Sequence, residues 1–354
     1  MHKVIVTGGA GFIGSALVRQ LVADTTAEIV IIDSLTYAAS RATLAPLEAT
    51  GRVRLIVEDI RNGAAMQQIL ALEQPGQIFH LAAETHVDRS IGDPSSFLTT
   101  NVMGTFNLLE AARTYWGGLK GEARDAFRFV HISTDEVYGS LGEDGYFSER
   151  TAYDPSSPYS ASKAASDHIA KAWQRTYELP VVISNCSNNY GPFQFPEKLI
   201  PLITLNAMEG KPLPVYGKGG NVRDWLYVED HARALLLIAQ NGALGETYVV
   251  GGRNERTNLH VVQTICDILD RLVPAAEPRR NSIIFVKDRP GHDHRYAIDA
   301  TRLEIELGWK ARETFETGLE QTIRWYLSHP EWWQPLRKSV YSGERLGLLN
   351  DTHS

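Results

Sequence analysis

Five side chains in this sequence have the types and spacings that an oxidation followed by an elimination requires. Tyr159 and Lys163 are four positions apart, so on a helix they lie on one face. A neighbouring ammonium stabilises a phenolate, which then takes a hydroxyl proton while hydride leaves the same carbon. Thr134 offers the hydroxyl that simple dehydrogenation uses beside the tyrosine. Asp135 and Glu136 add an acid and a base, which removal of water needs.

A glycine-rich turn indicates the hydride carrier. It follows the apolar run 4–7 and precedes helical spacing that starts at Phe12, the order expected of a dinucleotide-binding turn. Its glycines are Gly8, Gly9, Gly11 and Gly14. Asp33 lies 19 residues beyond Gly14 at the end of the next apolar run, where a carboxylate accepts hydrogen bonds from a ribose diol. Because that carboxylate would repel a 2′-phosphate, the pattern predicts NAD rather than NADP.

Each of these patterns also has a purely structural interpretation. An isolated Tyr-x-x-x-Lys is most often part of a surface helix, and Thr134 or Asp135 after a strand could simply cap a helix. We favour catalysis because the patterns occur together after a dinucleotide turn. Two carboxyls in a cleft are also costly to desolvate unless they transfer protons.

The elements that must position these residues alternate along the chain. Apolar runs typical of buried parallel strands are 4–7, 29–32, 53–57, 78–82, 129–132 and 181–184. Segments with helical spacing are 12–22, 100–113 and 160–177. This alternation predicts an α/β fold with a doubly wound parallel sheet of the Rossmann type, whose ligand crevice lies at the carboxyl ends of the strands.

Prolines and glycines become frequent after residue 186, which indicates a second, smaller domain. We expect residues 1–186 to form the NAD-binding domain, with the chain returning to it at about 222–252. Residues 187–221 and 253–354 are expected to form a C-terminal substrate-binding domain. Arginines in 223–228 and 288–292 are suited to bidentate contacts with a diphosphate there.

Composition restricts the remaining classes of function. A net charge of −7 over 354 residues argues against nucleic acid or an anionic membrane as the partner. No stretch approaches the roughly 18 apolar residues of a spanning helix, and no apolar leader is recognisable, so we expect a cytoplasmic protein. Cys186 and Cys266 are interpreted as reduced core thiols. The histidines have no metal-ligand spacing, so no metal is predicted.

Five segments carry a resemblance to a known family. They are residues 80–90, 132–139, 185–192, 196–201 and 288–296. With them the sequence resembles the extended short-chain dehydrogenase/reductases, specifically the dTDP-glucose 4,6-dehydratases, from about residue 3 to about residue 325. The resemblance implies a hydro-lyase of deoxysugar biosynthesis, for example that of rhamnose, with dTDP-glucose as substrate and a bound NAD regenerated in each turnover.

The resemblance also implies a role for each catalytic residue. Tyr159 would be the oxidation base and Lys163 its electrostatic partner and ribose ligand, while Thr134 would hydrogen-bond the 4-hydroxyl of the sugar. Asp135 would protonate the departing 6-hydroxyl, and Glu136 would remove the C5 proton that the new 4-ketone makes acidic. Hydride would then return to C6.

Two larger sets of binding residues follow from the same resemblance. Besides Tyr159 and Lys163, the cofactor would be lined by Gly8, Gly11, Phe12, Ile13, Gly14, Asp33, Ser34, Leu35, Thr36, Asp59, Ile60, Leu81, Ala82, Ala83, Thr85, Thr100 and Asn189. Besides Thr134, the nucleotide-sugar would be lined by Glu84, Asn188, Lys198, Leu199, Pro214, Val215, Tyr216, Arg223, Asn258, Asp288, Arg289, Pro290, Gly291 and His292. A homodimer built on helices 100–113 and 160–177 is also implied.

Three alternatives remain open at this point. A nucleotide-sugar 4-epimerase would share the glycine turn, Tyr159 and Lys163 but has no use for Asp135 and Glu136. A GDP-mannose 4,6-dehydratase resembles the chain less around Thr134 and usually takes NADP. A non-catalytic dinucleotide-sensing protein needs none of the catalytic residues. The nucleotide base, the sugar epimer and the downstream pathway are not determined by the residues themselves.

Overall fold

The computed structural model describes residues 3–343, so positions 1–2 and 344–354 of the two predicted domains lie outside the described residues. Within this range the main sheet has seven strands in the order β10-β6-β5-β4-β1-β2-β3, and every neighbouring pair is parallel. The strands are β1 (Lys3–Thr7), β2 (Glu28–Asp33), β3 (Val53–Val57), β4 (Gln77–His80), β5 (Arg128–Thr134), β6 (Val181–Cys186) and β10 (Thr247–Val250). The doubly wound fold predicted from the sequence is thereby confirmed.

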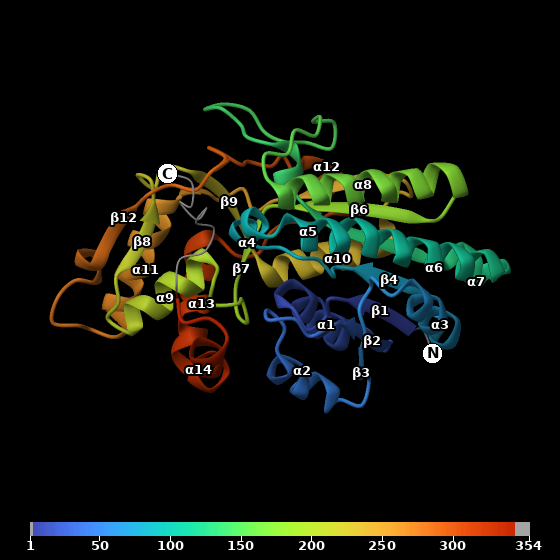
Figure 1. The fold of residues 1–354 in the computed structure, drawn as a ribbon, viewed down its shortest axis with the longest axis horizontal. Coiled ribbons are helices and arrows are strands. Elements are labelled where there is room, and N and C mark those ends of the chain that lie inside the picture. Colours follow the sequence, from blue (N-terminus) through green and yellow to red (C-terminus); the bar gives the residue numbers. More distant parts are fainter. Residues whose placement is uncertain (1–2, 344–354) are drawn as a thin grey trace.

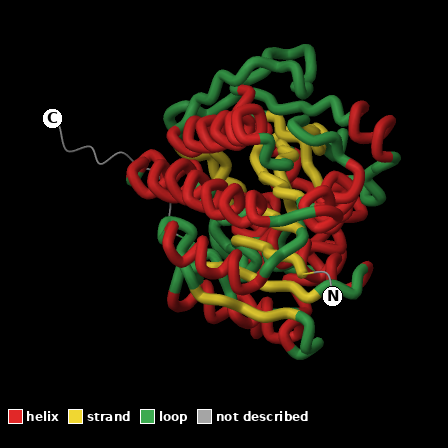
Figure 2. The backbone as a smooth tube through the Cα atoms, turned by 90° about the vertical axis from the view of Figure 1, so that its right-hand side faces the viewer, coloured by secondary structure: helices red, strands yellow, loops and turns green. Residues whose placement is uncertain are grey.

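Both faces of this sheet are buried under helices (Figures 1 and 2). On one face, α1 (Phe12–Asp24) packs against α10 (Val228–Asn241), and Val4 and Val6 belong to the core between them and the sheet. On the other face lie α3 (Gly63–Glu73), α6 (Thr105–Gly118) and α8 (Pro158–Tyr177), with Ile5 in their core. Successive side chains of β1 therefore point into different cores, which is why the strand reads as an uninterrupted apolar run.

Local signals explain where the functional helices begin. Ser157 accepts a hydrogen bond from the amide of Ser160, and the Ser160 hydroxyl accepts one from the amide of Ser157, so a capping box starts α8 with Pro158 in its first turn. By contrast α1 starts at Gly11 with no side-chain cap, which leaves its first amides for another acceptor. The predicted helix 100–113 is divided: Leu98–Gly104 is π-helical and α6 begins at Thr105.

The strand order fixes the location of the ligand crevice. The chain goes from β1 to β2 on one side, whereas β4 pairs on the other side of β1, so the direction of winding changes between β1 and β4. Ligands bind at such a switch point, outside the carboxyl ends of the strands. The glycine turn follows β1 and residues 81–85 follow β4, so both lie at this edge.

A second group of elements has its own apolar core and lies at one end of the molecule (left in Figure 1). Its small sheets are β11-β9-β7 and β12-β8. The strands are β7 (Asn188–Tyr190), β8 (Leu213–Tyr216), β9 (Val222–Tyr227), β11 (Glu255–Thr257) and β12 (Ile283–Val286). The helices are α9 (Leu199–Met208), α11 (Asn258–Leu272), α13 (Phe315–Ser328) and α14 (Pro330–Ser339). We call this group the second lobe.

The chain returns to the main sheet as α10 and β10, whereas β9 pairs with β7 and β11 instead. The predicted domain boundaries remain a prediction. The other helices are α2 (Arg41–Glu48), α4 (Val87–Gly92), α5 (Pro94–Phe97), α7 (Gly121–Ala126) and α12 (Thr301–Leu307), with short 3₁₀ turns at Asp135–Tyr138 and Arg279–Ser282. Across residues 3–343, no helix combines the length and apolar character needed to cross a bilayer.

Candidate active site

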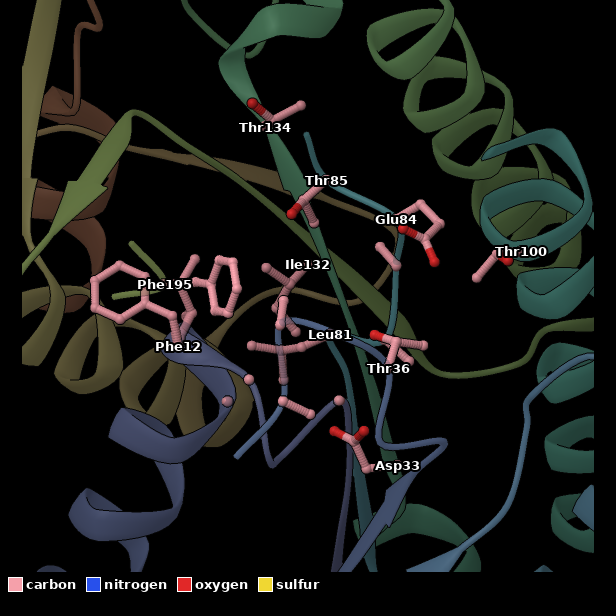
Figure 3. A pocket seen from close by; sticks show the side chains of 18 of the residues that line it. Phe12, Asp33, Thr36, Leu81, Glu84, Thr85, Thr100, Ile132, Thr134 and Phe195 are labelled. Atoms are coloured by element: carbon pink, nitrogen blue, oxygen red, sulfur yellow. The ribbon is translucent and has the colours of Figure 1, made fainter. Parts of the chain in front are cut away.

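A cavity of about 500 Å³ lies at the carboxyl ends of β1, β2, β4 and β5 and is bounded by the second lobe. Figure 3 shows Asp33 at the end of β2 and Thr134 at the end of β5 on opposite sides of the view, with Leu81 and Ile132 between them. The predicted residues that line it are Gly8, Gly11, Phe12, Ile13, Gly14, Asp33, Ser34, Thr36, Asp59, Ile60, Leu81, Ala82, Ala83, Glu84, Thr85, Thr100, Thr134, Glu136, Tyr159, Lys163, Asn188, Asn189 and Lys198. One cavity thus collects the glycine turn and four of the five catalytic candidates.

Two glycines of the turn have no room for a side chain. Gly8 has a φ of +71°, and a Cβ added there would lie 2.7 Å from the backbone nitrogen of Ala82. A Cβ on Gly14 would lie 2.1 Å from the carbonyl oxygen of Gly8. The first contact brings the turn against the chain after β4, and the second packs α1 against the turn. Together they hold the uncapped end of α1 at the cavity, where its amides can meet a pyrophosphate.

Asp33 connects the end of β2 to the glycine turn. Its Oδ2 accepts a hydrogen bond from the amide of Ala10 at 2.9 Å, and its Oδ1 accepts one from the amide of Leu35 at 2.8 Å. Burial raises the pKa of this carboxyl, and the two amide hydrogen bonds oppose the rise. A carboxylate has about four acceptor positions, so the two oxygens keep capacity for a ribose diol.

Tyr159 is buried at the far end of the cavity, and its pKa is raised well above the usual value. Burial is the main cause and the charge of Glu136 the next, whereas a hydrogen bond with Thr134 works in the opposite direction. Lys163 donates from Nζ to the carbonyl oxygen of Ile132 at 2.8 Å, and burial lowers its pKa. Phenolate formation therefore needs further positive charge in the cavity, which an oxidised nicotinamide would supply.

Asp135 and Glu136 differ in their access to the cavity. Asp135 is 1% exposed and does not line the cavity. Its Oδ1 accepts a hydrogen bond from the Thr134 hydroxyl at 3.4 Å, and its Oδ2 has no hydrogen-bond partner among the described residues. Burial raises its pKa well above the usual value, and the charges of Glu136 and Asp224 add to the rise. A raised pKa favours the protonated carboxyl, which is the form that a proton donor requires.

Glu136 lines the cavity and is surrounded by cations. Burial raises its pKa, and the positive charges of Arg289, Arg223 and Lys198 oppose that rise in this order. Of these three cations only Arg223 is among the main influences on the pKa of Asp135, so the two neighbouring acids experience different surroundings. Neighbouring acids in different electrostatic surroundings are suited to opposite roles in proton transfer.

A buried hydrogen-bond network behind these residues was not anticipated. Asp167 accepts from Asn185 Nδ2 at 3.0 Å through Oδ2, and its Oδ1 lies 3.0 Å from His131 Nε2. Asn185 also donates to the carbonyl oxygen of Thr134 at 3.1 Å. The only sequence signal for this network is the position of Asp167 one turn beyond Lys163 on the same face of α8. It fixes the end of β5 against the helix that carries Tyr159.

The remaining predicted residues lie outside the cavity. They are Leu35, Leu199, Pro214, Val215, Tyr216, Arg223, Asn258, Asp288, Arg289, Pro290, Gly291 and His292. Apart from Leu35 they belong to the second lobe. Arg289 and the hydroxyl of Tyr216 both donate to Asp88 of α4, each at 2.9 Å. Arg223 covers the ring of Tyr296 at 4.1 Å. The binding roles of all these residues remain predictions.

Some residues of the cavity wall were missed by the sequence analysis. They are Ile32, Ala38, Ala39, Glu58, Arg61, Ser96, Ile132, Ser133, Cys186, Ser187, Gln194, Phe195 and Glu197. Six of these thirteen are direct neighbours of predicted residues, so adjacency in the chain was an available signal for them. Glu197 stands between Pro196 and Lys198 in one of the recognised segments. No cluster of three His, Cys, Asp or Glu side chains suited to a metal ion occurs in residues 3–343.

Comparisons with known proteins agree with this geometry. The family model described as GDP-mannose 4,6 dehydratase matches residues 5–322. A relative from Sinorhizobium fredii, named a probable dTDP-glucose 4,6-dehydratase, is 62% identical over 98% of this chain and 99% of its own. The dTDP-glucose 4,6-dehydratase 1 of Escherichia coli K12 is 55% identical over 96% of both chains. This chain belongs to the dTDP-glucose 4,6-dehydratase family.

Solved structures place the family in its wider fold. The dTDP-glucose 4,6-dehydratase of Bacillus anthracis, solved in complex with NAD, matches with a TM-score of 0.84 at 42% identity, covering 95% of this chain and all of that one. The enzyme from Streptomyces venezuelae, with NAD and a second ligand bound, gives 0.87 at 45% identity, with 94% and 99% coverage. A Thermus thermophilus UDP-glucose 4-epimerase in complex with NAD gives 0.81 at 28% identity, with 92% and 99% coverage. Fold and family are therefore confirmed.

Proposed function

We propose that this protein converts dTDP-glucose into dTDP-4-keto-6-deoxyglucose and water, with NAD regenerated in every turnover. One observation carries the proposal: a single cavity contains the dinucleotide turn, the Tyr159 and Lys163 pair, and Glu136, with the Asp135 carboxyl next to the Thr134 hydroxyl. A dehydrogenase or an epimerase would use the first two features without the acid and the base. The relatives named above carry the same activity in their names.

The residues present fit NAD. The uncapped end of α1 would bind its pyrophosphate, Asp33 would accept from its adenosine ribose, and Lys163 would bind the ribose beside the nicotinamide. When bound, NAD supplies an acceptor for hydride from C4 and a donor of hydride to C6. The close backbone contacts at Gly8 and Gly14, which both line the cavity, support this placement of the pyrophosphate.

The protein groups then exchange protons at O4, C5 and O6 of the sugar and hold the sugar in position. Tyr159 takes the proton of the 4-hydroxyl as C4 is oxidised, with the Thr134 hydroxyl holding the sugar oxygen in place. Glu136 takes the C5 proton, which the 4-ketone has made acidic. Asp135 gives its proton to the 6-hydroxyl, which leaves as water. When hydride has been delivered to C6, Glu136 gives a proton that exchanges with solvent back to C5, and the proton taken up by Tyr159 is balanced by reprotonation of Asp135. Rotation or a small displacement of Asp135 is implied, because its carboxyl lies behind Thr134 and not in the cavity wall.

We further propose the assembly and location predicted from the sequence. Leu98 and Met103 of the π-helical segment and Tyr177 at the end of α8 are exposed apolar side chains near α6, which supports a homodimer built on these helices. The two cysteines are buried and unpaired, which supports a reducing, cytoplasmic location. We assign residues 1–186 and about 222–252 to cofactor binding and the rest of the chain to the nucleotide-sugar.

The decisive experiment follows hydrogen through one turnover. Purified protein is given equal amounts of dTDP-glucose deuterated at C4 and dTDP-glucose labelled with ¹³C in every sugar carbon, and the product masses are measured. We expect deuterium at C6 only in molecules without ¹³C, and a solvent hydrogen at C5. Return of deuterium to C4 would identify an epimerase, and its loss to free NADH would identify a dehydrogenase. Either result would refute the proposal. UDP-glucose and GDP-mannose in parallel reactions test the nucleotide and sugar.

A further inference from the structure

Glu197 is a buried carboxylate that the proposed chemistry does not use. It lies in the segment between β7 and α9, lines the cavity, and has a side chain only 1% exposed. Its Oε2 accepts a hydrogen bond from Arg89 Nε at 2.9 Å, and its Oε1 accepts one from the hydroxyl of Tyr37 at 2.9 Å. A carboxylate taken out of water in this way requires partners, and Glu197 has one on each oxygen.

The two partners also contact each other. The guanidinium of Arg89 lies over the ring of Tyr37 at 3.9 Å from its centre. The ring of Tyr37 meets the ring of Phe195 edge-on, with 5.4 Å between the centres. Burial and the negative charge of Glu197 raise the pKa of Tyr37, so its hydroxyl stays protonated and continues to donate. We call Tyr37, Arg89 and Glu197 the clasp.

The clasp joins two walls of the cavity that belong to different parts of the chain. Tyr37 comes from the loop after β2, where its neighbours Thr36 and Ala38 line the cavity. Glu197 comes from the second lobe, 160 positions later, where Phe195 and Lys198 line the cavity. Figure 3 shows Thr36 and Phe195 among the lining side chains on separate segments of the ribbon. Arg89 comes from α4, a third element. The proposed chemistry does not require contacts among Tyr37, Arg89 and Glu197.

We propose that Glu197, together with Tyr37 and Arg89, holds these two walls together across the bound dinucleotide and thereby determines how long NAD stays in the cavity. Glu197 is on this account a positioning residue. The inference rests on the proposed function to the extent that NAD must wait in the cavity between its two hydride transfers. It does not depend on which nucleotide-sugar is the substrate.

The test measures release of NAD itself. Purified holoenzyme is mixed with a large excess of the fluorescent analogue 1,N⁶-etheno-NAD, and the appearance of free NAD is followed over time. We expect release to be about 10-fold faster or more in Glu197→Gln and Tyr37→Phe, because each loses a buried charge-assisted hydrogen bond. The double variant should be scarcely faster than Glu197→Gln, since both changes remove the same contact.

Glu73→Gln is the matched control. Glu73 is 5% exposed and accepts from Lys3 and Arg54 at 2.9 and 2.7 Å, so it is a comparable buried carboxylate, but it does not line the cavity. We expect a lower melting temperature for Glu73→Gln with wild-type NAD release. Tyr37→Phe removes a single oxygen and guards against misfolding as the cause of faster release.

The proposal would be overturned if Glu197→Gln and Tyr37→Phe released NAD at the wild-type rate. It would also be overturned if Glu73→Gln accelerated NAD release as much as they do. Failure of the proposed function has a different signature. If the wild-type protein releases no NAD on denaturation, the assignment of the cofactor and the proposed role of the clasp are both refuted. If it holds NAD yet makes no keto-sugar, the proposed chemistry fails and faster release in the two clasp variants still supports the clasp.

Discussion

Substitution of Gly14 by alanine tests the cofactor site through a contact that the structure defines closely. The added Cβ would lie 2.1 Å from the Gly8 carbonyl oxygen and 2.8 Å from Gly9 Cα. The first distance is about 1.3 Å shorter than ordinary van der Waals contact. Both neighbouring atoms belong to the backbone, so no side-chain rotation relieves the overlap. The glycine turn must move away from α1 by about 1 Å.

Two losses of different size follow from this displacement. Overpacking of this kind costs about 1–3 kcal/mol of folding stability. Displacement of binding groups by about 1 Å costs on the order of 100-fold in function that depends on their geometry, and the amides of the turn are such groups. We therefore expect Gly14→Ala to fold with a moderately lower melting temperature but to bind NAD about 100-fold more weakly.

The assay is NAD released per chain on denaturation, together with melting curves recorded with and without added NAD. Gly117→Ala is the control, because Gly117 lies in α6 with nothing within 4 Å of an added Cβ. We expect it to retain NAD fully and to be slightly stabilised, since alanine favours the helix. Full NAD content in Gly14→Ala with an unchanged melting temperature would refute the account of the turn.

Two further predictions concern the neighbouring acids. Glu136→Gln should oxidise C4 but eliminate water about 10²- to 10⁴-fold more slowly, because an amide cannot take the C5 proton. The absorbance of bound NADH should therefore increase after dTDP-glucose is added. Normal product formation without accumulation of NADH would mean that another group is the base. Asp135→Asn should be more stable than wild type above about pH 4. The pKa of Asp135 is raised in the folded protein. The wild-type carboxyl therefore lowers the free energy of unfolding progressively as pH rises from its unfolded pKa of about 3.9 towards its folded pKa, whereas the asparagine does not titrate. The difference in melting temperature should vanish near pH 4 and increase towards pH 7, and a pH-independent difference would contradict the burial argument.

The sequence alone determined the architecture because its signals are local. Strands of a parallel sheet are buried on both faces, so β1 and β2 appear as short continuous apolar runs between turns. The turn at Gly8 and Gly14 was identified because only glycine fits those two positions, which limits the residue type. The i, i+4 spacing of Tyr159 and Lys163 similarly places both residues on one face of α8, because helix geometry relates positions four apart.

Local signals were less informative where neighbouring segments decide the conformation. The helical spacing of 100–113 did not reveal that Leu98–Gly104 is π-helical. The spacing also did not reveal that Asp135 lies behind Thr134 while Glu136 faces the cavity, although the two are adjacent in the chain. Burial of each carboxyl depends on β9 and the second lobe, which the sequence places far away.

Only the tertiary structure decided which distant groups meet. Glu197 contacts Tyr37 across 160 positions, and Arg289 contacts Asp88 across 201. Neither pairing has a periodic or motif signal, because a hydrogen bond between side chains depends on where two loops finish in space and not on the spacing within either. The sequence specified the reactive groups and the elements that carry them. The packing of the second lobe against the sheet decided their burial, their partners and the boundaries of the cavity around them.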